Sequence, residues 1–384
     1  MSTVAIAGLG ITEMGKVYGR TATDFAADAI TLALEDAGLT KADVDGLLIH
    51  SNNSPEMNPM LQMSLGFLDL KVLCGMSAFG STSSSMINYA THVINSKQAE
   101  VVVMVYADAP LRQGGSAGAA YARARPPMGM ESFNVAHGFY GANVGYALAA
   151  RRHMELFGTT SEQFGAVAVA QRQWAVMNER AQMRAPMTLD DHQASRWVVE
   201  PLHLLDCCLV SNGAVAVVMT SAERAKGLRQ PPVFVLGTGQ AAPGDSKRTD
   251  RDPGIYTGAT KSGEQAFAAA GVTRDDIDVL ELYDCYTYTV LVTLEDYGFC
   301  AKGEGGSFVE DGKLGPGGSL PTNTGGGQLS SYYMWGFTPL AEGISQARGH
   351  GGERQVEKHD LVLVSGNGGF LNFHGTIILS PRES

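Results

Sequence analysis

The residues best suited to chemistry lie in one glycine-rich stretch, Asn323-Thr-Gly-Gly-Gly-Gln-Leu-Ser-Ser-Tyr-Tyr-Met-Trp-Gly336. Successive glycines let backbone N–H groups approach a bound group closely, and the segment after them is typical of a helix start, which favours an oxyanion. We therefore expect this turn to form the mouth of an active site, in which Gly326 and Gly327 bind the oxyanion of a substrate. A surface turn without function is the alternative that this segment alone leaves open.

The cysteine and glycine patterns argue against cofactors. The five cysteines are an odd number and include no C-x-x-C pair, so the sequence predicts buried, reduced thiols, with neither a disulfide framework nor a zinc site. The first expected strand ends in Gly8-x-Gly10, but the third glycine comes only at Gly15, and no acid-ended strand follows at the dinucleotide spacing. We expect no cofactor and no metal.

Composition and charge limit the class of protein. The 384 residues are 44% hydrophobic and 17% charged, and the formal net charge is −11. The length exceeds the usual limit for one core, and the composition is that of a globular protein. The negative charge argues against nucleic acid as a partner. The sequence shows neither an apolar stretch of spanning length nor a signal peptide, so we expect a cytoplasmic protein.

An internal repeat organises the elements that must position these residues. The segment Ala33-Leu-Glu-Asp-Ala-Gly-Leu-Thr-Lys-Ala-Asp-Val-Asp-Gly-Leu-Leu-Ile49 is matched by Ala266-Phe-Ala-Ala-Ala-Gly-Val-Thr-Arg-Asp-Asp-Ile-Asp-Val-Leu-Glu-Leu282. In each copy we expect a helix to end at a glycine, Gly38 or Gly271, before a Thr/Asp cap and a short buried strand. Strands and helices continue to alternate in both halves, which predicts mixed, parallel-rich sheets covered by helices.

The repeat divides the chain into two predicted halves, 1–228 and 229–384. The first half contains an extra segment at about 110–205, expected to be helical from Gly141 through Arg180. A long insert on one half is typical of a binding element. Its arginines either meet a phosphate-bearing substrate or form a solvated helix face, and the sequence leaves both open (Arg123, Arg125, Arg151, Arg152, Arg172, Arg180 and Arg184).

These repeats and loops resemble the thiolase superfamily, above all the sterol-carrier-type thiolases and the thiolase-like aldolases that cleave steroid side chains. The resemblance covers nearly the whole chain and implies a duplicated α/β/α/β/α five-layer fold with an inserted helical loop domain. Thiolases have a nucleophilic cysteine where this chain has Ser77 and a catalytic histidine where it has Tyr333. Their Asn-Glu-Ala-Phe segment corresponds to Tyr283-Asp-Cys-Tyr286 in this chain, and their segment with the second cysteine corresponds to Ser365-Gly-Asn-Gly-Gly369.

Changes at all four catalytic positions indicate a different reaction. Claisen condensation needs a thiolate, a histidine and a cysteine acid/base, which a serine without histidine cannot replace. The aldolase subgroup is similar to this chain in having tyrosines at both places. It implies retro-aldol cleavage of a β-hydroxyacyl-CoA, in which one of Tyr283 and Tyr333 takes the hydroxyl proton and the other protonates the enolate. Which does which stays open, and Tyr286 or Tyr332 could be mistaken for the pair. A tyrosine acting as base needs neighbouring donors, because its free pKa is near 10.

The resemblance also implies binding residues and partners. Ser77 and Asn367 occupy positions whose backbone N–H groups hold the thioester oxygen in thiolases. His374, in Asn372-Phe-His-Gly375, is similar to a motif element of the aldolases, and a packed core histidine is the alternative. The implied partners are an acyl-CoA substrate, a second copy of the chain in a homodimer, and a small protein with an OB-fold and a zinc ribbon.

Two other functions stay open at this point. One is an acyl-CoA acyltransferase of the same fold, and the other is a catalytically silent subunit that binds acyl-CoA or lipid. Tyrosines at two matched catalytic positions favour the aldolase. The ketone product, the acyl chain and the steroid nature of the substrate cannot be read from the residues.

Overall fold

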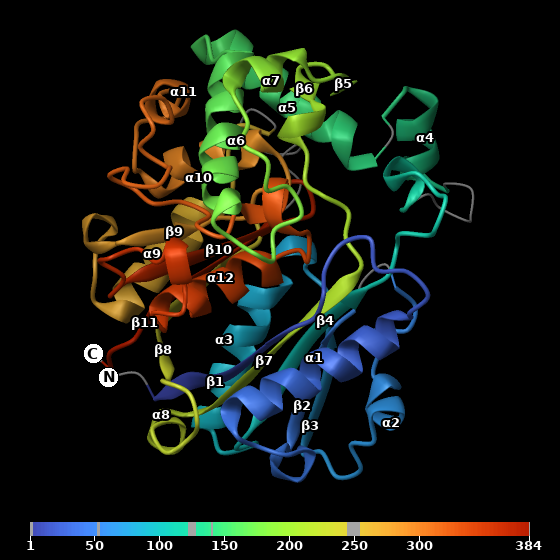
Figure 1. Ribbon diagram of the computed structural model, residues 1–384, viewed down its shortest axis with the longest axis vertical. Coiled ribbons are helices and arrows are strands. Elements are labelled where there is room, and N and C mark those ends of the chain that lie inside the picture. Colours follow the sequence, from blue (N-terminus) through green and yellow to red (C-terminus); the bar gives the residue numbers. More distant parts are fainter. Residues whose placement is uncertain (1–2, 52–53, 122–127, 140, 244–253, 384) are drawn as a thin grey trace.

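In the computed structural model, nine strands form one mixed sheet in the order β3-β2-β4-β7-β1-β8-β11-β10-β9 (Figure 1). The structure describes residues 3–51, 54–121, 128–139, 141–243 and 254–383. The first half supplies β1 (Val4–Ile11), α1 (Ala22–Ala37), β2 (Gly46–His50), α2 (Leu61–Leu65), β3 (Val72–Met76), α3 (Thr82–Asn95), β4 (Val102–Asp108), β7 (Gly213–Ser221) and α8 (Ala222–Ala225). The second supplies β8 (Val233–Ala241), α9 (Ala259–Ala270), β9 (Val279–Glu281), α10 (Thr287–Tyr297), α11 (Gly305–Phe308), α12 (Phe337–Ala347), β10 (Val362–Gly368) and β11 (Phe373–Ser380).

The strand order is mirrored about the junction of β1 and β8. From that junction outward the first half runs β1-β7-β4-β2, and the second runs β8-β11-β10-β9. Equivalent strand pairs run in the same relative direction in both halves. The pairs β1–β7 and β8–β11 are antiparallel, as are β4–β7 and β10–β11, whereas β2–β4 and β9–β10 are parallel. Within the sheet, β1 and β8 connect the halves through the pairs Ala5–Phe234 and Ile6–Val233.

The two copies of the sequence repeat fold alike. Helices α1 and α9 both end at a glycine in the left-handed region, Gly38 with φ 74° and Gly271 with φ 69°. A short 3-10 turn follows each, capped by Thr40 with Asp43 in the first copy and by Thr273 with Asp276 in the second. The turns lead into β2 and β9, which hold equivalent places in the sheet.

Alternating side chains divide the core into layers. On β4, Val103 and Val105 pack with α1, while Met104 and Tyr106 point to the opposite face. That second cluster includes side chains of both α3 and α12 as well as strands of both halves, so these two helices lie between the halves. A third cluster joins α9 and α10 to the outer face of the second half. The predicted five-layer α/β/α/β/α architecture is therefore observed.

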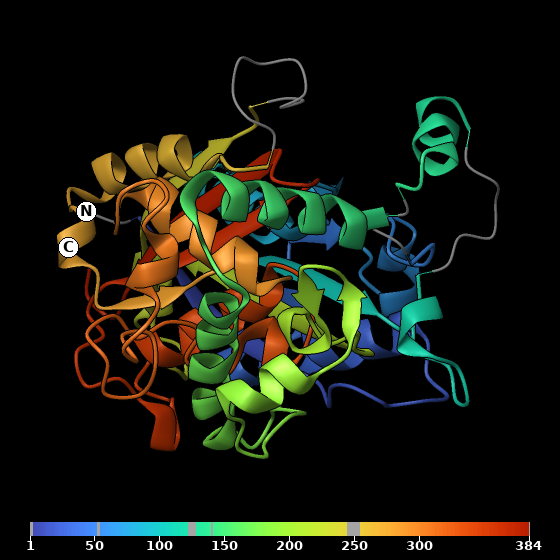
Figure 2. The same ribbon diagram turned by 90° about the horizontal axis from the view of Figure 1, so that it is seen from above.

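The insert adds helices at one end of the molecule (Figure 1). It contains α4 (Met130–Ala136), α5 (Gly141–Phe157), α6 (Ser161–Val176), α7 (Leu189–Ala194) and the short hairpin of β5 (Trp197–Val199) and β6 (Leu202–His203). Seen from that end, α5 and α6 lie over the body, while α4 stands apart from it (Figure 2). Among the described helices, none is both long and apolar enough to cross a membrane.

Candidate active site

The hydroxyl oxygens of Tyr283 and Tyr333 lie 3.3 Å apart, although the two residues are 50 positions apart in sequence. Tyr283 follows the end of β9, and Tyr333 lies just before α12. The Tyr333 N–H donates to the Ser211 hydroxyl at 3.0 Å, which ties this segment to the strand-like stretch before β7. The structure thus brings the predicted pair together at the junction of the halves.

The environment keeps both phenols neutral. Burial raises the pKa of Tyr283 well above its usual value, and the nearby Cys285 and Tyr146 raise it further. Burial likewise raises the pKa of Tyr333, with Tyr283 as the next cause. The hydrogen bond between the hydroxyls lowers the pKa of Tyr283 but does not offset burial. A neutral phenol can donate one proton and accept another, so the pair is built to pass protons rather than to hold a phenolate.

The loop before α3 packs directly against Tyr283. A Cβ placed on Gly80 would lie 2.2 Å from the Tyr283 ring and 2.2 Å from the Asn367 carbonyl oxygen, so only glycine fits. The Ala78 N–H donates to Thr82 Oγ1 at 2.8 Å, which fixes the turn into the helix. Ser77, three residues before Gly80, is exposed. The loop meets the tyrosine pair through its backbone.

Asn367 and His374 face each other across β10 and β11. Both atoms of the buried Asn367 amide lack a hydrogen-bond partner among the described residues. The His374 ring, in contrast, is fully paired, with Nδ1 2.9 Å from Ser262 Oγ and Nε2 3.2 Å from Ser365 Oγ. Burial lowers the pKa of His374 to about 3, so the ring is neutral. Its geometry is that of the packed, hydrogen-bonded histidine considered as the alternative.

The glycine turn binds an internal carboxylate. A Cβ on Gly327 would lie 2.1 Å from Asp284 Oδ2, and one on Gly326 would lie 2.6 Å from the Ala175 side chain of α6. The Gln328 N–H donates to Asp284 Oδ2 at 2.8 Å. The Gly326 N–H donates to the Asn323 carbonyl oxygen at 2.8 Å, and the expectation that Gly326 and Gly327 receive a substrate oxyanion stays a prediction.

The segment after the glycines also differs from the expected helix start. Residues Gly327–Ser331 form one π-helical turn, and α12 begins only at Phe337. Tyr333 consequently sits on extended backbone between two helical elements, where its side chain can reach Tyr283. A continuous helix would have turned successive side chains by about 100° each and carried Tyr333 onto another face.

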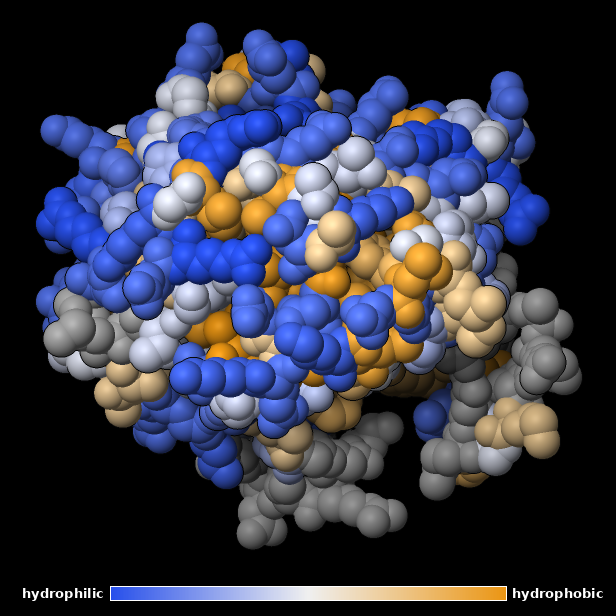
Figure 3. All heavy atoms as spheres, turned by 90° about the horizontal axis from the view of Figure 1, so that it is seen from below, coloured by the Kyte–Doolittle hydropathy of each residue, from blue (hydrophilic) through white to orange (hydrophobic). Residues whose placement is uncertain are grey.

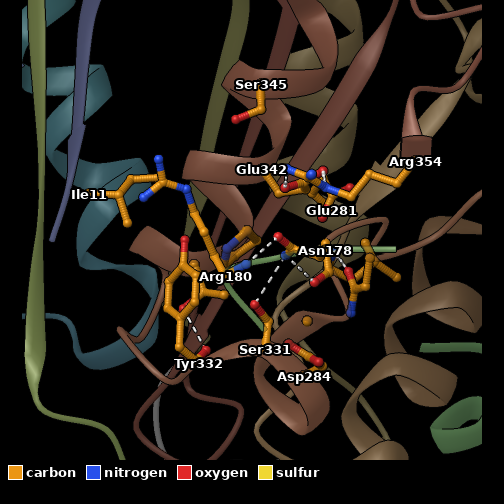
Figure 4. Close-up of a pocket in the computed structure, with 16 residues that line it drawn as sticks. Ile11, Asn178, Arg180, Glu281, Asp284, Ser331, Tyr332, Glu342, Ser345 and Arg354 are labelled. Atoms are coloured by element: carbon orange, nitrogen blue, oxygen red, sulfur yellow. Dashed lines mark hydrogen bonds and ion pairs between the residues drawn. The ribbon is translucent and has the colours of Figure 1, made fainter. Parts of the chain in front are cut away.

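A small cavity of about 30 Å³ lies beside the glycine turn (Figure 4). Its walls include Leu282, Asp284 and Tyr332, the sequence neighbours of the two tyrosines. Figure 4 shows the carboxylate of Glu342 beside Arg354, whose Nε lies 2.9 Å from Glu342 Oε1. A space of this size suits a single water molecule. The cavity is lined in part by polar residues of the turn and is too small for a substrate. Tyr332 is one of its lining residues.

Two tyrosines that could be confused with the pair have other partners. The Tyr286 hydroxyl donates to Asn143 Oδ1 on α5, and its ring packs 4.6 Å from Tyr146. Tyr332 lines the small cavity described above. Tyr286 therefore joins the insert to the second half, and the contact between Tyr283 and Tyr333 is distinct from both.

The insert arginines have mixed roles. Arg172 is buried and donates to Ser330 Oγ at 2.9 Å, and Arg151 pairs with Glu200 at 2.8 Å. Arg180 lines the small cavity. Arg123 and Arg125 lie outside the described residues. Arg151 thus makes an ion pair within the insert, and Arg172 joins the insert to the second half.

Two buried carboxyl groups, Asp284 and Asp108, had no functional signal in the sequence. Burial raises the pKa of Asp284 to about 7, although this residue was quoted only as part of a motif. Asp108, at the end of β4, accepts hydrogen bonds from Tyr106 and from Tyr121 of the insert. Tyr121 is a single tyrosine in a glycine- and alanine-rich segment, and no sequence pattern there predicts its hydrogen bond to Asp108.

All five cysteines are free, but the prediction that they are buried holds for Cys285 alone. Only Cys285 is fully buried, and the other four are partly exposed. Burial raises the pKa of Cys285 to about 12, which keeps its thiol protonated. A thiol in that state is a poor nucleophile.

The chain is similar to known proteins both in sequence and in structure. Residues 239–381 match the family model described as "Thiolase C-terminal domain-like". The chain is 37% identical to a steroid side-chain-cleaving aldolase of Thermomonospora curvata, over 95% of each chain. It is 36% identical to the 17-hydroxy-3-oxo-4-pregnene-20-carboxyl-CoA lyase of Mycobacterium tuberculosis, over 95% of this chain and 96% of that one. Among solved structures, the Ltp2-ChsH2(DUF35) aldolase superposes with a TM-score of 0.88 at 35% identity, covering 100% of this chain and 99% of the other.

Proposed function

The chain belongs to the steroid side-chain-cleaving aldolases of the thiolase superfamily, and on this basis we propose that Tyr283 and Tyr333 perform the two proton transfers of its retro-aldol reaction. The enzyme is a carbon–carbon lyase. Its proposed substrate is a β-hydroxyacyl-CoA with a steroid-type acyl group. The name of the Mycobacterium tuberculosis relative describes such a thioester, with its hydroxyl at position 17 and its carboxyl-CoA group at position 20.

Retro-aldol cleavage needs one proton removed and one delivered. As the Cα–Cβ bond breaks, which leaves a ketone at Cβ and places the bonding electrons in the thioester enolate, the β-hydroxyl proton moves to one tyrosine oxygen. In the same step that tyrosine passes its own proton to the other tyrosine, which delivers its proton to Cα. Both phenols are neutral before and after the step. The 3.3 Å contact between the two hydroxyls is the observation that carries this proposal.

The substrate remains a thioester throughout the proposed reaction. Ser77 is exposed, and with Tyr333 at the position where thiolases have their histidine, its hydroxyl is not activated as a nucleophile. We assign the thioester oxygen to backbone N–H groups at Ser77 and Asn367, a role that does not depend on their side chains. No cofactor or metal takes part in the proposed chemistry.

The test is product analysis with a β-hydroxyacyl-CoA of the steroid type. We expect equal amounts of ketone and shortened acyl-CoA, and no acyl group on the protein by mass spectrometry. An acyl group trapped on Ser77 would support the acyltransferase instead. Tight binding of the thioester without turnover, in the protein supplied with a small partner of the proposed kind, would support the silent subunit.

We also propose that the enzyme is a homodimer joined through β3. This strand is at the edge of the sheet, and Leu73 on it is exposed, as are Met60, Met63 and Leu68 around α2. Figure 3 shows apolar side chains gathered on the underside of the molecule, the end at which Figure 1 draws α2 and β3. An exposed edge strand with apolar neighbours favours pairing with a second copy.

A small partner protein is proposed as well. The description of the solved relative names a complex with ChsH2(DUF35), and that relative matches this chain over its whole length. We propose that the corresponding partner here has a zinc ribbon and an OB-fold. Co-expression and size-exclusion chromatography would test whether the two proteins elute together.

A further inference from the structure

Four aromatic rings form a row that ends at the tyrosine pair. The ring centroids of Phe373 and Phe79 lie 6.3 Å apart, with an angle of 26° between the ring planes. Those of Phe79 and Trp335 lie 5.8 Å apart at 11°, and those of Trp335 and Tyr333 lie 6.1 Å apart at 29°. The rings are thus nearly parallel, and they come from three separate segments: the start of β11, the turn before α3 and the stretch before α12.

Phe79 is the most exposed ring of this row and adjoins both tyrosines. It is 43% exposed, whereas Trp335 is 7% exposed. The next residue, Gly80, packs against the other tyrosine of the pair, since a Cβ on Gly80 would lie 2.3 Å from the Tyr283 ring carbon that bears the hydroxyl. Phe79 therefore reaches Tyr333 through Trp335 and Tyr283 through Gly80.

The backbone holds these two rings in place at a cost in free energy. Phe79 has φ 52° and Trp335 has φ 50°, in the left-handed region that bulky residues rarely adopt. The Phe79 carbonyl oxygen accepts from the Thr82 hydroxyl at 2.6 Å and from His50 Nε2–H at 3.1 Å. The Trp335 carbonyl oxygen accepts from Gln328 Nε2 at 3.0 Å. Strained residues fixed in this way are typical of functional sites.

The chemistry of the proposed substrate determines what must lie beside the pair. In the thioester named for the Mycobacterium tuberculosis relative, the hydroxyl at position 17 is on the fused rings of the pregnene skeleton, and position 20 lies outside them. Cleavage of a thioester of this type leaves the ketone on the rings. Because the hydroxyl must reach a tyrosine oxygen, the apolar rings must begin next to the pair.

We propose that Phe79 is a specificity-determining residue whose exposed face receives the fused rings of the substrate. This inference rests on the proposed function and names the part of the substrate that the aromatic row binds. Nearly parallel rings offer a flat, rigid, apolar surface, which suits a rigid fused-ring group better than a flexible acyl chain. Contact between the two removes apolar surface of both from water.

The test measures binding by calorimetry, so that no turnover is required. The two ligands are the steroid ketone that cleavage at position 17 would leave, and free CoA. We expect Phe79→Ala to weaken binding of the ketone about 10- to 100-fold, because the apolar contact is lost. The Kd for CoA should stay within about twofold, since CoA carries no steroid rings.

Two further variants complete the binding test. Phe79→Gly also removes the ring, and glycine adopts φ 52° without strain, so this variant keeps the turn where alanine disturbs it. Phe157→Ala is the matched control. Phe157 is exposed to a similar degree, 37%, but it lies on α5, where its ring packs 4.8 Å from that of His153. We expect wild-type affinity for the ketone in this control.

Steady-state kinetics with the steroid thioester separate substrate binding from a merely structural role. We expect KM to rise about 10- to 100-fold in Phe79→Ala and Phe79→Gly, with kcat within about threefold of the wild type. A contact made equally in the ground state and the transition state changes KM alone. Loss of a residue that only supports the fold would weaken binding of CoA as well.

Two results would overturn the assignment of Phe79. One is wild-type affinity for the ketone together with wild-type KM in both Phe79 variants. The other is a change from dimer to monomer in these variants with unchanged affinity for the ketone, which would place Phe79 in a subunit contact. Failure of the proposed function would look different, because the wild type would then leave the steroid thioester uncleaved while Phe79 still contributed to binding of the ketone.

Discussion

Burial decides what the two central tyrosines can do. Isolated phenols ionise near pH 10, and burial moves the pKa of Tyr283 and of Tyr333 upward. Each hydroxyl therefore keeps its proton through the physiological range. The 3.3 Å contact then matters as a path for protons, because neither residue serves as a standing base.

Removal of either hydroxyl should stop catalysis. We expect Tyr283→Phe and Tyr333→Phe each to lower kcat by about 10²–10⁴-fold, because each removes one proton-transfer group. Tyr332→Phe is the matched control, since Tyr332 lines the small cavity beside the glycine turn. Steady-state cleavage of a β-hydroxyacyl-CoA measures all three. Near-native turnover in Tyr283→Phe or Tyr333→Phe would remove that residue from the mechanism.

Asp284 should make stability depend on pH. Its folded-state pKa of about 7 lies above the value of about 4 expected for the unfolded chain, so the folded state holds a proton that the unfolded state has lost. The contribution is fully present below about pH 4 and is lost as the pH rises through about 7. Asp284→Asn should flatten the fall in unfolding free energy between about pH 4 and 7, measured in urea. An unchanged pH slope would contradict this account.

The active site depends on how closely two elements approach. The turn before α3 and the end of β10 meet at the Tyr283 ring, and Gly80, Gly366 and Gly368 leave no room for side chains there. The glycine turn before α12 is held in a similar way by α6 and Asp284. Glycine at these positions therefore sets the spacing between elements.

Addition of one methyl group at Gly80 should displace Tyr283. The new Cβ would lie 2.2 Å from the Tyr283 ring, so we expect Gly80→Ala to lose cleavage activity and about 1–3 kcal/mol of stability. Gly118→Ala is the control, because nothing lies within 4 Å of a Cβ there. Thermal unfolding and kcat measure the two effects. Full activity in Gly80→Ala would show that the Tyr283 ring can move without cost.

The whole molecule combines a duplicated core with one edge left open. The mirrored strand order ends in β9 on one side and in β3 on the other. Apolar side chains around β3 and α2 remain exposed at the second edge. Two copies that paired there would cover surface that one copy leaves in water.

A charge at this edge should separate the proposed dimer. We expect Leu73→Glu to give a monomer by light scattering, because a carboxylate would be buried between the two edge strands. Leu189→Glu is the matched control, since Leu189 on α7 is equally exposed at 38% but lies in the insert. A wild-type monomer, or a dimer in Leu73→Glu, would rule out this interface.

The sequence by itself determined the duplicated fold, and it singled out Tyr283 and Tyr333, whose hydroxyls the structure places 3.3 Å apart. The repeat at Ala33–Ile49 and Ala266–Leu282 carries its own capping residues, and caps and buried strands are local features that sequence patterns express directly. The loss of the thiolase nucleophile is likewise visible at Ser77 without any structure. These features follow from residue types in neighbouring positions.

Only the tertiary structure decided how the surrounding groups are used. The Gly326–Gly327 turn was predicted to hold a substrate anion, and folding places Asp284 against it. The contact joins Asp284 to Gln328, 44 residues further along the chain, so no local sequence pattern encodes it. His374 was predicted to take part in binding, and packing of β11 against α9 and β10 places its ring beside Ser262 and Ser365. Asp108 and Tyr121 meet for the same reason: burial and partner choice depend on packing between distant segments.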